Sequence, residues 1–320
     1  MCAEGRQNEK RFGHFLTVAI QVKSSSRNAA MISASDYPLL LQYGSKCLSS
    51  HLVLYFLFKK LLPSKKDVGN DFPWKDDPSL TAHRIVAFFV MCNWCYLGFK
   101  HLLNYDYNSD SDLAALTFVP AGYEIAQYAM GALLIWDIPV GLVGGSGPTD
   151  IMMHLHHAGM LLVTACVLGF VNGLSTSGDG IVGTHLAPLF LGVVELSSIP
   201  LQIVDLFHPK KSPHWNRYIC DGSSTGLFKR LCFAVNEISR ILFALLFLLV
   251  RGLYFPYAIA TIAVPDFYAE GSLASWVLLI LSVLFTLLQM YWATLVFGQV
   301  KKALSGSGGK REDKRTGKEE

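Results

Sequence analysis

The sequence predicts an all-α protein, a polytopic transmembrane bundle of about seven spans. Of its 320 residues only 16% are charged and 52% are hydrophobic, with a mean hydropathy of +0.36, whereas soluble domains carry about 25% charged residues. Residues 81–300 hold nine Lys or Arg and thirteen Asp or Glu, too few to cover the surface of a soluble enzyme of this length. The same hydropathy excludes an intrinsically disordered chain.

The spans themselves are segments of about 20 mostly apolar residues, the length that a membrane helix needs. The first in chain order, 39–58, is the weakest, because Lys46 and His51 interrupt it. Stretches rich in Gly and Ser, such as 144–147 and 175–180, separate later segments as turns do. The six stronger segments are 85–103, 123–143, 151–170, 181–207, 231–255 and 273–297.

Outside these segments the chain is divided by composition. We expect residues 1–38 to form a disordered N-terminal tail and 303–320 a disordered cytosolic tail, with a first, weaker span at 39–62 and the main transmembrane domain at 80–302. The N-terminal tail is basic. Residues 10–35 contain no Asp or Glu, as is typical of transit peptides.

The loops predict the orientation, because Lys and Arg concentrate on the cytosolic side. Eighteen of them follow the first span, follow the fifth span or form the C-terminal tail, whereas the predicted opposite loops, 104–122, 171–180 and 256–272, have only Lys100 at an edge. The C-terminus is therefore predicted to be cytosolic and the N-terminus to lie across the membrane. The five basic residues of the N-terminal tail run against this assignment.

Ionisable residues are costly inside a membrane, so each one suggests a function or a partner. The richest group begins the fourth span, where helical spacing puts Asp150, His154 and His157 on one face. A carboxylate there can orient an imidazole as a base. We favour an interfacial position for His154 and a functional role for the pair His156 and His157. The other histidines are scattered singly, so no metal site is predicted.

Glu195 lies in the fifth span, between Val194 and the kink-permitting Pro200. Two interpretations stay open: a functional carboxylate, or one half of a buried pair with the Glu237 and Arg240 cluster of the sixth span. The predicted orientation places Arg251 and His185 in the half of the membrane away from the cytosol. It places the other polar residues in the cytosolic half: Asp137, the histidine group of the fourth span, Glu195, Glu237, Arg240 and Gln289. A polar cluster open to the cytosol suits a lipid substrate that meets a water-soluble donor.

The order of these motifs resembles the TLC-domain family, which includes the ceramide synthases and the translocation-associated membrane proteins. The resemblance covers roughly residues 80–302 and depends on the order and spacing of short motifs among the spans. The motifs are Asp137 after Tyr128-Ala-Met-Gly, His156-His157, Glu195-Leu-Ser-Ser-Ile-Pro200, Phe247-Leu-Leu-Val-Arg251 and Gln289-Met-Tyr-Trp292.

The match to the catalytic members of that family is incomplete. Ceramide synthases pair the His-His with a later His-Asp-x-Ser-Asp segment. Here Val194 stands in place of its His and Glu195 in place of its first Asp, while Ser197 matches and Ser198 replaces the last Asp. The Glu-x-Ser-x-x-Pro form is more similar to the smaller TLC-domain-containing branch, whose members are mostly linked to membrane lipid composition.

The resemblance therefore implies a multi-pass protein of lipid metabolism or membrane lipid homeostasis, which binds or regulates acyl lipids in a cytosol-facing polar cavity. Asp137, Ser197, Arg251, Gln289 and Trp292 would bind lipid or stabilise the bundle. The endoplasmic reticulum is the family's usual location. Membrane lipids are the expected partners, no nucleic acid is expected, and a homodimer or heterodimer stays open.

The alternative is an acyl-CoA-dependent sphingoid-base N-acyltransferase. His156 or His157 would then be the base on the amine, with Glu195 or Asp150 orienting it, and the basic loop 208–230 would meet the phosphates of CoA. This enzyme would need no resident cofactor, and acyl-CoA would be its co-substrate. The missing His and Asp of the second motif favour the broader, non-catalytic interpretation.

Overall fold

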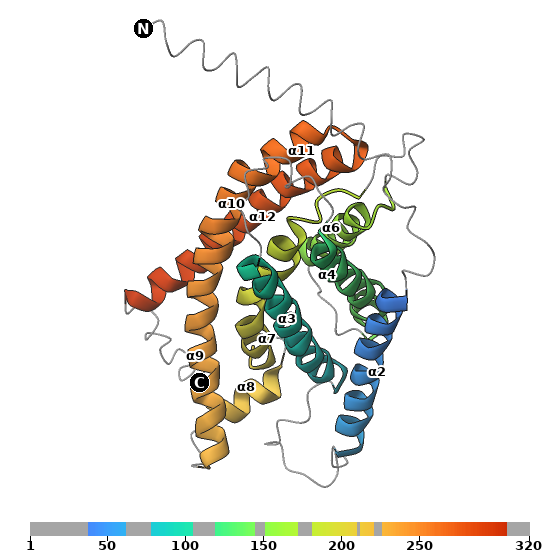
Figure 1. Cartoon of the computed structure of the whole chain (residues 1–320). Helices are drawn as coiled ribbons and strands as arrows, with labels where there is room; N and C mark the ends of the chain where they lie inside the picture. The colour runs from blue at the N-terminus through green and yellow to red at the C-terminus, as the bar shows by residue number, and fades with distance from the viewer. Residues whose placement is uncertain are drawn as a thin grey trace, which may run out of the picture. The chain divides into compact units, whose positions relative to one another are not determined.

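The computed structural model describes residues 38–61, 78–104, 119–144, 151–171, 181–209, 212–220 and 226–305 (Figure 1). Of these residues 91% are helical, and none of them forms a strand, which confirms the all-helical prediction. The predicted tails lie almost wholly outside the described residues.

Sixteen helical elements follow one another in the described part of the chain, and several join end to end. The label η marks a π-helix, except η8, which is a 3-10 helix. They are α2 (Pro38–Leu61), α3 (Pro78–Asn104), α4 (Pro120–Gly131), η5 (Ala132–Asp137), α5 (Ile138–Gly144), α6 (Ile151–Val167), η7 (Pro188–Gly192), η8 (Val193–Ser197), α7 (Ser198–Leu206), α8 (Pro213–Cys220), α9 (Leu227–Leu246), η9 (Phe247–Tyr254), α10 (Phe255–Ala258), η10 (Ile259–Ala263), α11 (Val264–Glu270) and α12 (Leu273–Leu304).

Five of these helical runs in the described part are long and apolar enough to cross a membrane, which fits an integral membrane protein. Two of the seven predicted spans fall short of that standard. Helix α6 is apolar but has only 17 residues, about 26 Å against a hydrocarbon core of about 30 Å. Helix α2 has 24 residues but is less apolar, as Lys46 and His51 led us to expect. The five long apolar runs are Pro78–Leu102, Pro120–Leu142, Pro188–Leu206, Leu227–Glu270 and Leu273–Leu304.

The sixth predicted span is much longer than expected. Residues 256–272 were predicted to be a loop, but the helical run that begins at Leu227 continues to Glu270. Pro256 and Pro265 lie within this continuous run, and each follows directly after a π-helical segment, η9 or η10. A local change to π geometry is one way in which a membrane helix tolerates the missing N–H of a proline. Gly271 ends the run in the left-handed conformation, with a φ of 70°.

The chain divides into two compact units, and the first contains Met1–Ser49, Tyr96–Gly192 and Ala263–Leu281. Within it, α4 packs against α6 and η7. The start of α2 approaches α4 so closely that a Cβ atom on Gly44 would collide with the carbonyl oxygen of Gly131. Small residues allow such backbone contact between membrane helices. The backbone N–H of Val119, just before α4, donates to Oγ1 of Thr184 at 2.9 Å.

The second unit contains Ser50–Cys95, Val193–Ile262 and Ser282–Glu320. Helix α7 packs along α9, and η8 packs against η9. One apolar cluster joins Phe207 to Trp215 and Ile219 of α8. A second joins Phe247 of η9 to Ala293 and Val296 of α12. These contacts fix the two segments that carry Glu195 and Arg251.

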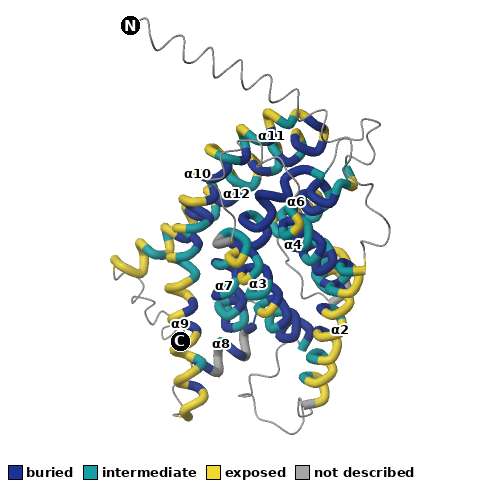
Figure 2. The backbone as a smooth tube through the Cα atoms, in the orientation of Figure 1, coloured by how far each residue is buried: buried dark blue, intermediate teal, exposed yellow. Residues whose placement is uncertain are grey.

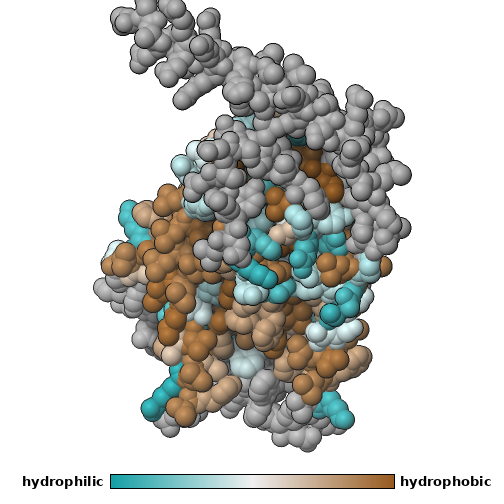
Figure 3. Space-filling model, in the orientation of Figure 1, coloured by the Kyte–Doolittle hydropathy of each residue, from teal (hydrophilic) through white to brown (hydrophobic). Residues whose placement is uncertain are grey.

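The few buried residues of helix α9 are polar, and most of the helix is exposed or half-buried (Figure 2), the reverse of a helix in a soluble protein. Its buried residues are Lys229, Asn236 and Ser239. Exposed apolar residues follow one another at intervals of one to four positions along α9, η9 and α10, and Figure 3 shows extensive hydrophobic surface on the molecule. This pattern is typical of a helix that faces lipid. The exposed residues include Leu231, Ile238, Ile241, Leu245, Leu249, Leu253 and Tyr257.

Candidate functional site

The first candidate site is a contact between a carboxylate of η5 and an imidazole of α6. Nδ1 of His157 lies 2.8 Å from Oδ2 of Asp137, and the two side chains are 22% and 13% exposed. A neutral imidazole that donates from Nδ1 to a carboxylate carries its basic lone pair on Nε2. The pair is thus an oriented imidazole with part of its surface accessible.

The backbone around Asp137 explains how the carboxylate reaches this position. Pro139 lacks the N–H that would bond to the carbonyl of Ile135 in an α-helix, and its ring crowds that carbonyl. The preceding turn widens into a π-helix, and the N–H of Ile138 bonds to the carbonyl of Leu133, five residues back. Asp137 is the last residue of this π segment, a kind of distortion that is common at functional sites.

The other members of the predicted histidine group divide clearly. His154 is exposed, in agreement with the interfacial position favoured for it, while His156 is partly buried. The ring centroids of His156 and His157 are 5.8 Å apart. Asp150 lies outside the described residues. The carboxylate that contacts His157 is Asp137, which the sequence analysis placed in the same motif set but did not choose as the orienting group.

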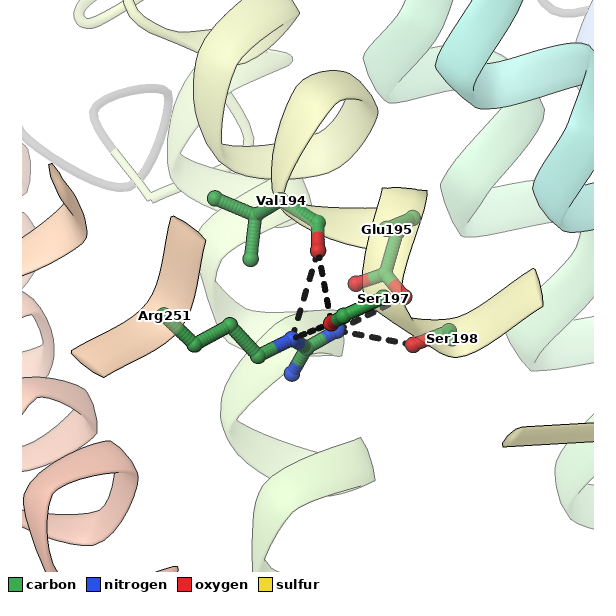
Figure 4. A network of polar contacts seen from close by, with 5 residues as sticks. All are labelled: Val194, Glu195, Ser197, Ser198 and Arg251. Carbon is green, nitrogen blue, oxygen red and sulfur yellow. Dashed lines mark hydrogen bonds and ion pairs between the residues drawn. The ribbon is translucent and has the colours of Figure 1, made fainter. Parts of the chain in front are cut away.

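The second candidate site is a buried network around Arg251, drawn in Figure 4. Nη2 of Arg251 donates to Oε2 of Glu195 at 2.9 Å and to Oγ of Ser198 at 2.8 Å. Nε donates to Oγ of Ser197 at 2.8 Å and to the carbonyl oxygen of Val194 at 3.2 Å. Glu195 and Arg251 are each only 5% exposed. The network satisfies a carboxylate, two hydroxyls and a backbone carbonyl with one guanidinium.

The distorted backbone of the fifth span makes this network possible. The π-helix η7 passes directly into the 3-10 helix η8, which ends just before α7. Pro200 has no N–H for the carbonyl of Leu196, so a regular α-helix could not satisfy all its carbonyls here. Side chains complete the bonding: the carbonyl of Val194 accepts from Arg251 and, at 3.4 Å, from Oγ of Ser197. Such substitution is how membrane helices tolerate a break.

The network decides between the two interpretations of Glu195. Glu195 is half of a buried ion pair, but its partner is Arg251 rather than the Glu237 and Arg240 cluster. Those two residues form their own pair at 3.8 Å along α9, and both are 47% exposed. Assigning Glu195 and Arg251 to opposite halves of the membrane was therefore wrong. Arg251 lies near the middle of the run Leu227–Glu270, so it reaches the depth of Glu195.

Two further ion pairs were not predicted. Oδ2 of Asp266 lies 3.0 Å from Nε2 of His185, which is buried. Nη1 of Arg84 lies 3.0 Å from Oδ2 of Asp205 and donates at 3.0 Å to Oε1 of Gln202. The signal that could have found them is the general one, that an ionisable residue in an apolar segment needs a partner.

The remaining predicted polar residues lie on α12. Gln289 is 2% exposed, and among the described residues no hydrogen bond is made to its buried Oε1 atom. Trp292 packs against the cluster formed by Phe247, Ala293 and Val296. In the described residues, no three His, Cys, Asp or Glu side chains are grouped so that they could hold a metal ion.

The two candidate sites differ in what they can do. In the Arg251 network the carboxylate of Glu195 already accepts a hydrogen bond from the guanidinium, so this carboxylate is not available to bind a ligand. Ionised groups satisfied in this way stabilise and position the helices that carry them. The Asp137 and His157 pair keeps accessible surface and a titratable ring, so it is the better candidate for contact with a ligand. The chain matches no protein-family model, no curated protein and no solved structure.

Proposed function

We propose that the chain is a multi-pass TLC-domain membrane protein that binds acyl lipids, or regulates their content in the membrane, through the Asp137–His157 pair. The observation that carries this proposal is the 2.8 Å contact between two partly exposed ionisable side chains on apolar helices. Such a pair is expensive to keep in a membrane unless it is used.

An amphipathic ligand fits the surroundings of the pair. His157 lies on α6, where Leu155 and Leu162 are exposed apolar residues. A lipid brings acyl chains for such apolar surface and a polar group for the imidazole and carboxylate. A fully water-soluble ligand would gain nothing from the apolar surface.

The topology belongs to the same proposal. Helices α2 and α6 would add two spans to the five long apolar runs, which gives seven in all, with a cytosolic C-terminus in the endoplasmic reticulum membrane. A glycosylation acceptor inserted at 175–178 should then be modified, and one inserted at 212–214 should not. The reverse result would invert the orientation and remove the argument for a cytosol-facing site.

Photo-crosslinking tests the binding site. The purified full chain in lipid nanodiscs is exposed to a photoactivatable, alkyne-tagged acyl lipid, and the covalently attached tag is quantified. Asp137→Asn should reduce labelling several-fold, because the amide no longer holds the imidazole in its orientation. Asp266→Asn is the matched control, since it breaks the other carboxylate–histidine contact and should leave labelling unchanged. Equal labelling of wild type and Asp137→Asn would remove the pair from the proposed site.

The 2.8 Å geometry also favours a second function, the acyl-CoA-dependent N-acylation of a sphingoid base. His157 would accept a proton from the amine as its nitrogen attacks the thioester carbonyl of acyl-CoA. The C–N bond forms, the C–S bond breaks, and the thiol of CoA leaves with a proton. Asp137 would orient the imidazole, the role that the sequence analysis gave to Asp150 or Glu195.

A microsomal assay separates the two functions. Microsomes that contain the protein receive an acyl-CoA and a labelled sphingoid base, and the amide product is compared between wild type and His157→Ala. Product equal to background in both samples excludes the enzyme. Product that His157→Ala makes at the full rate excludes the role given to that residue.

A further inference from the structure

The first turn of α9 presents backbone donors that the helix itself does not use. The N–H groups of the first residues of an α-helix have no acceptor within the helix, and a side chain at the N-cap often supplies one. Here the N-cap residue is Gly226, and among the described residues no side-chain cap hydrogen bond is made. The N–H of Arg230 is the first to bond back, to the carbonyl of Gly226 at 3.2 Å. The N–H groups of residues 227–229 therefore stay available to an acceptor.

The charges around this turn are all positive. Aligned peptide dipoles give the start of a helix a partial positive charge, which Asp or Glu in the first turn usually balances. The first turn of α9 contains no acidic residue, and Lys229 and Arg230 add two cations to it. Three sources of positive charge thus lie within about one turn. This arrangement is unfavourable unless an anion binds there.

Lys229 is an independent sign of such an anion. It is only 7% exposed, although lysine is rarely buried without a partner. In the part of the chain that the structure describes, its ammonium group makes no hydrogen bond or ion pair. Side chains of a helix lean toward its N-terminus, so the ammonium group extends toward the free N–H groups. A buried cation without a counter-charge is costly, and a bound anion would remove that cost.

Apolar side chains around the turn indicate what kind of molecule brings the anion. Cys232, one turn after Lys229, packs against the apolar cluster of Trp215, and α8 packs against α9 (Figure 1). On the outside, Leu227 and Phe228 are 83% and 53% exposed. A phospholipid supplies a phosphate for the N–H groups and acyl chains for this exposed apolar surface. A soluble phosphate would leave the apolar surface uncovered.

We propose that the N-terminus of α9 binds the phosphate group of an anionic phospholipid. The N–H groups of residues 227–229 donate to the phosphate oxygens, and Lys229 and Arg230 balance its charge. A phosphomonoester headgroup, as in phosphatidic acid, fits best, because it carries up to two negative charges and three oxygens that can accept hydrogen bonds. The inference goes beyond the proposed function, since this headgroup site uses neither Asp137 nor His157.

The headgroup preference of the full chain tests the proposal. The purified protein in detergent is mixed with equal amounts of phosphatidic acid and phosphatidylcholine with the same chains, and the bound lipids are counted by native mass spectrometry. The wild type should bind phosphatidic acid about tenfold more, a preference of the size that one hydrogen bond between charged groups gives. Lys229→Gln should lose most of it, whereas Lys302→Gln, the same change at the exposed end of α12, should keep it. Equal binding of the two lipids by the wild type would overturn the site.

A change at the N-cap separates this site from a general attraction of basic residues for anionic lipids. An added Cβ atom on Gly226 meets nothing within 4 Å, so the residue can be replaced without a clash. Gly226→Asp supplies a carboxylate that accepts from the free N–H groups and takes the place of the phosphate. This variant should lose the preference, whereas Gly226→Ala, which adds no acceptor, should keep it. A preference that survives in Gly226→Asp would contradict the proposal.

Three further samples identify the source of the anion. CoA at the same concentration as the lipid should not displace phosphatidic acid, and displacement would make the site one for soluble phosphates and overturn the lipid assignment. Asp221, outside the described residues, is the nearest acidic residue before α9 in the sequence. A preference that appears only in Asp221→Asn would mean that the chain's own carboxylate fills the site, which also overturns it. Asp137→Asn should keep the headgroup preference, and its loss there would assign headgroup recognition to the Asp137–His157 pair.

Discussion

Arg251→Met is expected to destabilise the protein far more than any comparable change at its surface. The substitution keeps much of the length of the side chain but removes the guanidinium, so the carboxylate of Glu195 stays buried without its counter-charge. It also removes four hydrogen bonds that hold η8 against η9. The stability of this contact between the fifth and sixth predicted spans should therefore depend on one residue.

The magnitude follows from the burial of the pair. Breaking a buried ion pair by removing one partner costs about 3–5 kcal/mol, and Arg251 and Glu195 are both 95% buried. A cost of 1 kcal/mol lowers Tm by roughly 2–4 °C in chains of 150–250 residues, so Tm should fall by at least about 6 °C. Replacing Glu195 by Gln in the same chain removes the stranded charge, and the double variant should recover much of the loss.

The assay can use the protein's own cysteines. Cys47, Cys95 and Cys166 are free and buried, so a thiol-reactive fluorophore reports their exposure as the detergent-solubilised protein unfolds. Arg240→Met is the matched control, because Arg240 makes an exposed pair at 3.8 Å whose worth is about 0–1 kcal/mol. An Arg251→Met protein with the same Tm as Arg240→Met would refute the reasoning.

Two further substitutions test the packing and the lipid-facing surface. Gly44→Ala should lower Tm by about 2–12 °C, because its Cβ atom would collide with the carbonyl of Gly131 and overpacking costs about 1–3 kcal/mol. Gly298→Ala, with open space at its Cβ position, should not lower Tm, and an equal fall in both variants would contradict the close approach. Leu249→Lys should sharply reduce membrane integration in a microsomal assay, since a mid-membrane Lys costs about 2.5–3.5 kcal/mol. Leu304→Lys, beyond the basic end of α12, should integrate normally, and normal integration of both would mean that the side of η9 at Leu249 does not face lipid.

The helices could be predicted because the length and polarity of apolar segments depend on the chain alone. Their ends were harder to predict. The range 256–272, which contains Pro256 and Pro265, was predicted to be a loop, yet both prolines lie within one continuous helical run. A proline removes only the N–H bond at its own position, and the π-helical segments η9 and η10 before the two prolines let the helix continue past the missing bonds.

The partners of the polar residues could be predicted only in part. Sequence polarity identified His157, Glu195 and Arg251 as unusual, but it could not assign partners across helices. Arg240 and Arg251 lie on the same run, and only the packing of η8 against η9 selects Arg251 for Glu195. Asp137 reaches His157 through a π-helical turn, which a regular helical periodicity does not describe.

The most direct test of the central claim is to map where a photoactivatable acyl lipid attaches to the full chain in nanodiscs. The proposal predicts labelled peptides from η5 and α6 around Asp137 and His157, and their loss in Asp137→Asn but not in Asp266→Asn. Labelling confined to the exposed apolar residues of α9 and α12, and unchanged by Asp137→Asn, would show only surrounding bilayer lipid and would contradict the proposed site.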